Sequence, residues 1–353
     1  MKHTHIILTT LVLFCLVKKT IAQTTTDVVT LWAEPFALSF NENDLYIALF
    51  YQNSISKVDI TETPSTETNV LGGLNRPSAL ALNGNYLYIA EQSEGKVSKI
   101  DITETTPTAI DVITGLIIPM ALAFNGNDLY IAESTAGKIS KIDITETTPT
   151  IVEVVSGLSL PMGLAFHGNY LYIAEQAGSK VSKIDITETT PTTIDVITGL
   201  IVRALAFNGN DLYMLSLASD KISKIDITET APTIVDVVTG LSSPRAFAFK
   251  ENNLYIAQGS NFNGKISKFD LNTLSTESSF FNKTIILHPN PSSNFIQITN
   301  LNSKKSYKIF DILGVEIKKG IISNNDQIDI RNFTNGLYLL KFDNGNIIKF
   351  LKE

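Results

Sequence analysis

The pair Leu-Tyr returns along this chain at an almost constant spacing. Its leucines are Leu45, Leu87, Leu129, Leu171, Leu212 and Leu254. The intervals between them are 42 residues, apart from one of 41 residues. A period of this length, repeated six times, requires an architecture in which similar units stack against one another, such as a solenoid or a β-propeller.

Each repeat contains four short segments of β-forming composition. In the third repeat they are residues 121–124, 129–132, 139–144 and 151–155, and the turn Asn-Gly-Asn at 125–127 separates the first two. Asn-Gly between two apolar runs is a strong hairpin signal. Four strands in each of six units predict an all-β fold, a six-bladed β-propeller rather than a solenoid or a sandwich.

The two ends of the array predict how the ring closes. The last repeat stops at Leu271 without a fourth segment, whereas residues 27–32 stand alone before the first repeat. This isolated segment resembles the fourth segments at 195–199 and 236–240. We therefore expect residues 27–32 to complete the last blade of a propeller that spans residues 23–271, which removes an exposed sheet edge.

The repeat resembles a known family of propellers. Its fourth copy reads PMGLAF at 161–166, LYIAE at 171–175 and KVSKID at 180–185. This pattern is similar to the NHL-type repeat, and the similarity extends over residues 27–271. The resemblance implies a six-bladed ring that serves mostly as a binding scaffold. Because the related gluconolactonase-like propellers are calcium-dependent hydrolases, the repeat predicts the fold better than the activity.

The first 22 residues have the features of a secretory signal peptide. Lys2 precedes an apolar run from Ile6 to Val17, and Ala22 provides a small residue for cleavage. The run is shorter than the roughly 20 residues that span a bilayer, so we expect no transmembrane segment in the mature chain. The only cysteine, Cys15, lies within this segment, which leaves the mature chain without a disulfide or a thiol nucleophile.

The net charge changes sign after a segment rich in Ser and Thr at residues 272–281, which we interpret as a linker. It is −14 over residues 23–281 and +4 over residues 282–353. With a total of −7, the chain lacks the broad basic face that nucleic-acid binding requires. Alternating apolar and polar residues beyond 282 predict a small C-terminal β-sandwich.

An ordered set of motifs in this last segment resembles the type IX secretion system C-terminal sorting domain of Bacteroidetes. The matching positions are Pro289, Asn290, Pro291, Asp311, Gly314, Gly336, Tyr338, Lys349 and Lys352. The resemblance implies that residues 282–353 act as a sorting signal for the type IX machinery. It further implies Sec export to the periplasm, followed by secretion or display on the outer cell surface. An ordinary adhesive sandwich is the alternative for this segment.

Superposition of the repeats places two sets of residues at one face of the ring. Just after the second strand the blades carry Leu49, Glu91, Glu133, Glu175, Ser216 and Gln258. Where the innermost strand begins they carry Phe36, Ser78, Met120, Met162, Arg203 and Arg245. Only His167 and His288 lie outside the signal segment, in different domains, which argues against a Ser-His-Asp triad or a multi-histidine metal site.

Each set supports a functional and a structural interpretation. Glu91, Glu133 and Glu175 would hold calcium through oxygen ligands or supply a general acid and base. Alternatively, each glutamate binds a loop amide or a lysine of its own blade. Arg203 and Arg245 would bind an anionic group, such as a uronic acid or a peptide carboxylate, unless they only pair with nearby acids.

The near-identity of the blades favours a binding protein over an enzyme, because catalysis needs one asymmetric set of groups. We expect a secreted or surface-displayed propeller that binds a glycan or a protein, with Arg203, Arg245, Met120, Met162 and Phe36 as the ligand-binding residues. An extracellular calcium-dependent hydrolase or lactonase is the alternative. A purely structural surface component is the third possibility.

Overall fold

The computed structural model describes residues 25–260, 262–272, 286–299, 301, 304–312, 314–342 and 347–353. The chain divides into two compact units, Met1–Asp270 and Leu271–Glu353. The regular elements of the described residues are β-strands, which confirms the all-β fold. The expected signal segment, and the expected linker beyond residue 272, lie outside the described residues. A search of the described residues finds no helix of the length and apolarity that crossing a membrane requires.

The first unit contains six antiparallel sheets of four strands each. In sheet order the strands are β2 (Pro35–Asn41), β3 (Asp44–Leu49), β4 (Ser54–Asp59) and β5 (Glu67–Leu71); β6 (Pro77–Asn83), β7 (Tyr86–Glu91), β8 (Lys96–Asp101) and β9 (Ile110–Thr114); β10 (Pro119–Asn125), β11 (Asp128–Glu133), β12 (Lys138–Asp143) and β13 (Val152–Ser156); β14 (Pro161–His167), β15 (Tyr170–Glu175), β16 (Lys180–Asp185) and β17 (Ile194–Thr198); β18 (Val202–Asn208), β19 (Asp211–Ser216), β20 (Lys221–Asp226) and β21 (Val235–Val238); and β22 (Ala246–Lys250), β23 (Asn253–Gln258), β24 (Gly264–Asp270) and β1 (Thr26–Leu31).

These sheets form a closed ring, and we number them as blades one to six in the order just given. The innermost strand of each blade contacts that of the next, and β22 of the sixth blade contacts β2 of the first. The repeated Leu-Tyr pair explains the packing between blades. Its leucine is buried, and in five of the six blades its tyrosine meets a phenylalanine of the next blade edge-on, as in Tyr88 with Phe124, whose ring centroids are 5.0 Å apart.

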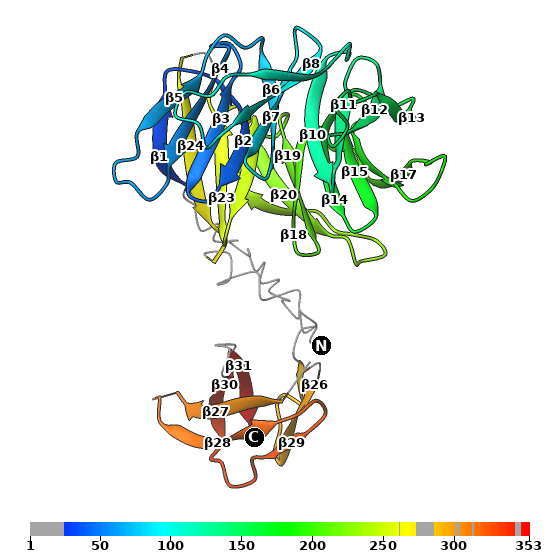
Figure 1. Ribbon diagram of the computed structural model, residues 1–353. Helices are drawn as coiled ribbons and strands as arrows, with labels where there is room; N and C mark the ends of the chain where they lie inside the picture. Colours follow the sequence, from blue (N-terminus) through cyan, green and yellow to red (C-terminus); the bar gives the residue numbers. More distant parts are fainter. Residues whose placement is uncertain are drawn as a thin grey trace, which may run out of the picture. The chain divides into compact units, whose positions relative to one another are not determined.

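The sixth blade is built from both ends of the array. β1 pairs antiparallel with β24, so that Thr26 lies opposite Lys268 and Leu31 lies opposite Gly264. Figure 1 shows this pairing where the blue start of the ring meets its yellow end. Leu31 and Ala33 are buried in the core between blades six and one. Closure therefore depends on a strand that precedes the first repeat.

Acid is expected to weaken this closure through Asp27 on β1. Burial favours the neutral acid, but hydrogen bonds from Lys265 and Ser267 outweigh it and lower the pKa of Asp27. A lowered pKa stabilises the folded state at pH values above the pKa of the unfolded chain, which is about 4. This stabilisation is lost as the pH falls through the lower pKa of the folded state. Because the Asp27 side chain is 49% exposed, the effect stays below about 1 kcal/mol. Melting temperatures of the wild type and of Asp27→Asn should differ at pH 7 and converge near pH 3; a constant difference would contradict this.

The second unit consists of two antiparallel sheets that share one core. Its strands are β25 (Ile286–His288), β26 (Phe295–Thr299) and β29 (Gln327–Asp329) in one sheet, and β28 (Glu316–Ile322), β27 (Lys305–Asp311), β30 (Gly336–Phe342) and β31 (Ile347–Lys352) in the other. Both sheets contribute to the buried cluster, for example Ile296 and Ile328 from the first and Ile309 and Leu340 from the second.

Several of the expected sorting residues hold this second unit together. Asn290, between Pro289 and Pro291, accepts a hydrogen bond from the backbone N–H of Leu351 (2.9 Å) and donates one to the carbonyl oxygen of Lys349 (3.2 Å). Asp311 accepts the backbone N–H of Val315 in a turn that contains Gly314 at a φ of 84°. The remaining sorting residues lie on the last two strands: Gly336 begins β30, Tyr338 stacks on Phe350, the Lys349 side chain is exposed and Lys352 is buried.

Candidate functional site

The six residues that begin the innermost strands line one pocket at the centre of the ring. They are Phe36, Ser78, Met120, Met162, Arg203 and Arg245. The pocket has a volume of about 110 Å³. One wall of the pocket is apolar, because Phe36, Phe50 and Met120 form a buried cluster against which Met162 packs. The structure thus brings together all the residues that the comparison of repeats placed at this position.

Arg203 is the most unusual of these side chains. It is 7% exposed, and its guanidinium lies over the ring of Phe36 with 4.0 Å between the guanidinium carbon and the ring centroid. Its Nε donates a hydrogen bond to the carbonyl oxygen of Arg245 (2.8 Å). Among the described residues no carboxylate lies within 4.0 Å of its nitrogens. The side chain lines the pocket, and the structure gives its terminal N–H groups no hydrogen-bond acceptor among the described residues.

The electrostatic setting of Arg203 favours a bound anion. Burial first, and then the positive charge of Arg245, lower the pKa of Arg203 to about 9, while Glu34 acts in the opposite direction. The side chain remains protonated at neutral pH. An anion in the pocket would relieve both the loss of solvation and the repulsion between the two arginines.

Arg245 is only partly satisfied within the protein. Its Nη2 lies 2.7 Å from Oε1 of the buried Glu34. Its Nε is buried and has no hydrogen-bond acceptor in the part of the chain that the structure describes. The two arginines and Glu34 together leave one net positive charge at the pocket.

The aromatic residues beside the arginines form a continuous stack. Phe36 stacks on Phe50 with 4.3 Å between ring centroids and 20° between ring planes. The guanidinium of Arg76 lies 5.7 Å from the centroid of Phe50. The order along the stack is therefore Arg203, Phe36, Phe50 and Arg76. Together with Arg245, three of the four arginines of the chain lie at this face.

Two departures from the repeat consensus explain the position of Arg203. The connection into β18 is one residue shorter than in the other blades, and Val202 replaces the proline found at Pro161 and Pro119. On the neighbouring strand β14, Gly163 replaces the alanine of the other blades, and a Cβ atom there would lie 2.7 Å from the carbonyl oxygen of Arg203. The absent side chain lets β18 lie close to β14.

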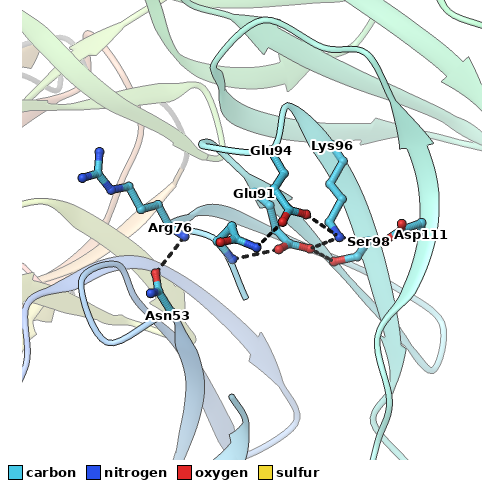
Figure 2. Close-up of polar contacts among 8 residues, drawn as sticks. Asn53, Arg76, Glu91, Glu94, Lys96, Ser98 and Asp111 are labelled. Carbon is cyan, nitrogen blue, oxygen red and sulfur yellow. Dashed lines mark hydrogen bonds and ion pairs between the residues drawn. The ribbon is translucent and has the colours of Figure 1, made fainter. Parts of the chain in front are cut away.

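The three glutamates have a different role in the structure. Figure 2 shows the arrangement in the second blade, where Glu91 is buried beneath the connection that leads into β6, while Arg76 points away from it. One carboxylate oxygen accepts the backbone N–H of Asn75 (2.8 Å), and the other accepts the hydroxyl of Ser98 (2.7 Å). Lys96 lies 3.6 Å from the same oxygen as Ser98.

The same arrangement recurs in the third and fourth blades. Glu133 binds the N–H of Ile117 and the hydroxyl of Ser140, and Glu175 binds the N–H of Ser159 and the hydroxyl of Ser182. In the sixth blade Gln258 contacts the same two groups: its amide oxygen accepts the N–H of Ser242 (3.0 Å), and its amide N–H donates to the hydroxyl oxygen of Ser267 (2.7 Å), which reverses the direction of the second hydrogen bond. An uncharged amide therefore replaces the carboxylate without loss of geometry.

This geometry argues against the predicted calcium site. Each carboxylate uses both of its oxygens within its own blade, so Glu91, Glu133 and Glu175 do not converge on one ion. In the described residues no group of three or more His, Cys, Asp or Glu side chains is arranged to hold a metal. The structure supports the alternative weighed above, in which each glutamate anchors a loop.

Glu133→Ala is expected to destabilise the protein by about 2–4 kcal/mol, because it leaves the N–H of Ile117 without its acceptor and opens a cavity. Glu133→Gln should cost far less, since Gln258 already fills this role in the sixth blade. Thermal unfolding of both variants, with EDTA and with excess calcium, measures the difference. A calcium-dependent rise in melting temperature that disappears in Glu133→Ala would instead support the metal site.

Comparison of the repeats did not identify several residues that contact the lining of the pocket. Glu34 lies outside the aligned positions, and Phe50 and Tyr51 are aromatic where no other blade carries an aromatic residue after the second strand. The signal was present, since the first blade reads Leu49-Phe50-Tyr51 where the second reads Glu91-Gln92-Ser93. Departures of one blade from the others mark the pocket better than the residues that the blades share.

Comparisons with known proteins identify the second unit. Residues 286–352 match the family model of the secretion system C-terminal sorting domain. This match confirms the sorting domain and indicates type IX secretion of the chain to the cell surface or the extracellular space. No curated protein matches the chain.

Solved structures similar to this chain are propellers of low sequence identity. The luciferin-regenerating enzyme has a TM-score of 0.57 at 12% identity and covers 70% of this chain and 95% of its own. A gluconolactonase, XC5397 from Xanthomonas campestris, has a TM-score of 0.57 at 11% identity, with 70% and 88% covered. Virginiamycin B lyase from Staphylococcus aureus has a TM-score of 0.54 at 14% identity, with 70% and 98% covered. At such identities the likeness shows the propeller fold alone.

Proposed function

We propose that this chain is an exported binding propeller that holds an anionic, carboxylate-bearing ligand in its central pocket. The carrying observation is Arg203, a buried side chain that lines the pocket and whose terminal N–H groups have no acceptor among the described residues. A guanidinium binds a carboxylate through two parallel hydrogen bonds. Arg245 supplies a second cation, and Phe36 packs against the guanidinium of Arg203 and fixes its orientation.

A binding role fits the rest of the pocket better than catalysis. The described lining residues are arginine, methionine, phenylalanine, serine and small apolar residues, none of which is an ordinary general base at neutral pH. The glutamates on which the hydrolase alternative relies are engaged in separate blades. The sorting domain agrees with a protein that meets its ligand outside the cell.

Arg203→Gln is expected to weaken binding of carboxylate polymers about 10- to 100-fold, because it removes a charged hydrogen-bond donor worth about 1.5–3 kcal/mol. The probes are polygalacturonate, its methyl-esterified neutral form, and poly-glutamate, measured by titration calorimetry with the purified protein. The affinity of Arg203→Lys should lie between those of the wild type and Arg203→Gln, since lysine keeps the charge but loses the paired donors. Arg331→Gln is the matched control, because Arg331 is exposed and pairs with Asp329 in the second unit.

Three results would overturn this proposal. The first is the absence of binding to any anionic probe, and the second is equal binding of the charged and the esterified polymer. The third is undiminished binding by Arg203→Gln in a protein whose melting temperature shows that it is folded. Binding that weakens with added salt in the wild type, and is lost in Arg203→Gln alone, supports it.

A further inference from the structure

Three aromatic side chains stand largely in solvent on the pocket face of the ring. Trp32 is 85% exposed, Phe262 is 71% exposed and Tyr51 is 59% exposed. They are the only aromatic side chains of the described residues that are more than half exposed. Trp32 is also the only tryptophan of the chain. We call these three residues the aromatic platform.

The platform occupies one sector of the ring, at blades six and one. Trp32 directly follows Leu31, which pairs with Gly264, and Phe262 lies two residues before Gly264. Tyr51 packs edge-on against Phe50, with 5.0 Å between ring centroids, and Phe50 stacks on Phe36. Tyr51 therefore extends the aromatic stack that carries Arg203, and Trp32 and Phe262 flank it on blade six.

A single rigid segment joins the platform to the anion pocket. Within residues 32–36, Trp32 points to solvent, Glu34 pairs with Arg245, and Phe36 lies beneath Arg203. Ala33, Glu34 and Pro35 are buried between these positions, so the backbone of the segment is held in place. Exposing three large aromatic side chains, with Trp32 on a fixed backbone, is unfavourable in water, and such sites mark interaction surfaces.

The shapes of the pocket and the platform favour a sugar chain as the ligand. A pocket of about 110 Å³ is well below the 300–1,000 Å³ that encloses a small-molecule ligand, so it accommodates one group such as a carboxylate. The rest of the ligand must lie on the outer surface. Sugar rings present flat C–H faces that stack on exposed aromatic rings, whereas apolar peptide side chains need concave pockets to bury them.

We infer that the ligand is an acidic oligosaccharide, an inference that rests on the proposed function. One uronate carboxylate binds Arg203 and Arg245, and the neighbouring sugar rings lie across the aromatic platform. Peptides with acidic side chains then bind only through the arginines, without contact to Trp32. The platform thus confers a preference for longer sugar chains.

The experiment titrates the purified protein with galacturonic acid, with its linear tetramer and with tetra-glutamate. Binding is followed by calorimetry and by the fluorescence of Trp32, which reports the platform directly because the chain has no other tryptophan. We expect the tetramer to bind at least about tenfold more tightly than the monomer and to change the tryptophan emission. Trp32→Ala should remove this advantage.

Tyr86→Ala is the matched control, since Tyr86 is 39% exposed and begins β7 at the end opposite to the pocket. Each outcome separates the two proposals. If tetra-glutamate binds through Arg203 and neither sugar binds, the inference of an acidic oligosaccharide is wrong, whereas the proposal of an anion-binding pocket is supported. If the tetramer binds no more tightly than the monomer, or Trp32→Ala keeps the advantage, the platform has no role. If no anionic probe binds, both proposals fail.

Discussion

Removal of residues 25–31 is expected to lower the melting temperature of the protein by more than about 10 °C. These residues form β1, which supplies the outer strand of the sixth blade and buries Leu31 between blades six and one. Loss of a buried leucine alone costs about 3–5 kcal/mol. Each kcal/mol corresponds to roughly 2–4 °C for a domain of this size. The deletion also exposes the edge of β24, which promotes aggregation.

The comparison is between a chain that begins at Trp32 and one that begins at Thr25, both followed by circular dichroism and light scattering. A synthetic peptide of residues 25–33 added to the shorter chain should restore part of the lost stability, because the peptide binds the folded ring and not the unfolded chain. Equal melting temperatures for the two chains would show that the ring holds without its closing strand.

Gly264→Ala is expected to destabilise the protein by at least about 3 kcal/mol, although it adds only a methyl group. The added Cβ would overlap the carbonyl oxygen of Ala33 and would lie 2.7 Å from Cδ of Pro35. Ala33 belongs to the connection between β1 and β2, and Pro35 begins β2. Buried residues hold this segment in place on both sides of Ala33 and Pro35. The clash therefore forces the closing strand away from β24.

Gly72→Ala provides the matched control, since a Cβ at Gly72 has no atom within 4 Å and its backbone is not left-handed. Urea unfolding of the two variants measures the difference in the free energy of unfolding. If both variants unfold at the same urea concentration as the wild type, the contact between Gly264 and Ala33 does not restrain the ring.

The periodicity of the sequence was sufficient to predict most of the first unit. The Leu-Tyr spacing identified the second strand of every blade, and Asn-Gly turns identified the hairpin between the first and second strands in blades two, three and five. These signals are local, since they depend on residues within one repeat. The prediction for the pocket rested on the same register, and the structure places all six aligned residues around it.

The repeat pattern offered both a metal-binding and a loop-anchoring role for the glutamates, and it did not identify the groups that they contact. Glu91 reaches the N–H of Asn75, sixteen residues earlier, and no propensity or period encodes that contact. A partial signal was available, because Ser98, Ser140 and Ser182 follow their glutamates by seven residues. The replacement of glutamate by Gln258, opposite Ser267, also indicates a hydrogen-bonding role rather than a charge.

The pairing of β1 with β24 joins residues that are about 240 positions apart, as in the hydrogen bond between Asp27 and Ser267. A chain that emerges from its N-terminus cannot form this contact until the sixth blade has also emerged. As the chain is made, the first strand must wait, unpaired, for the last one. Completion of the ring therefore requires the full length of the first unit, and residues 271–353, which include the sorting domain, follow it in the chain.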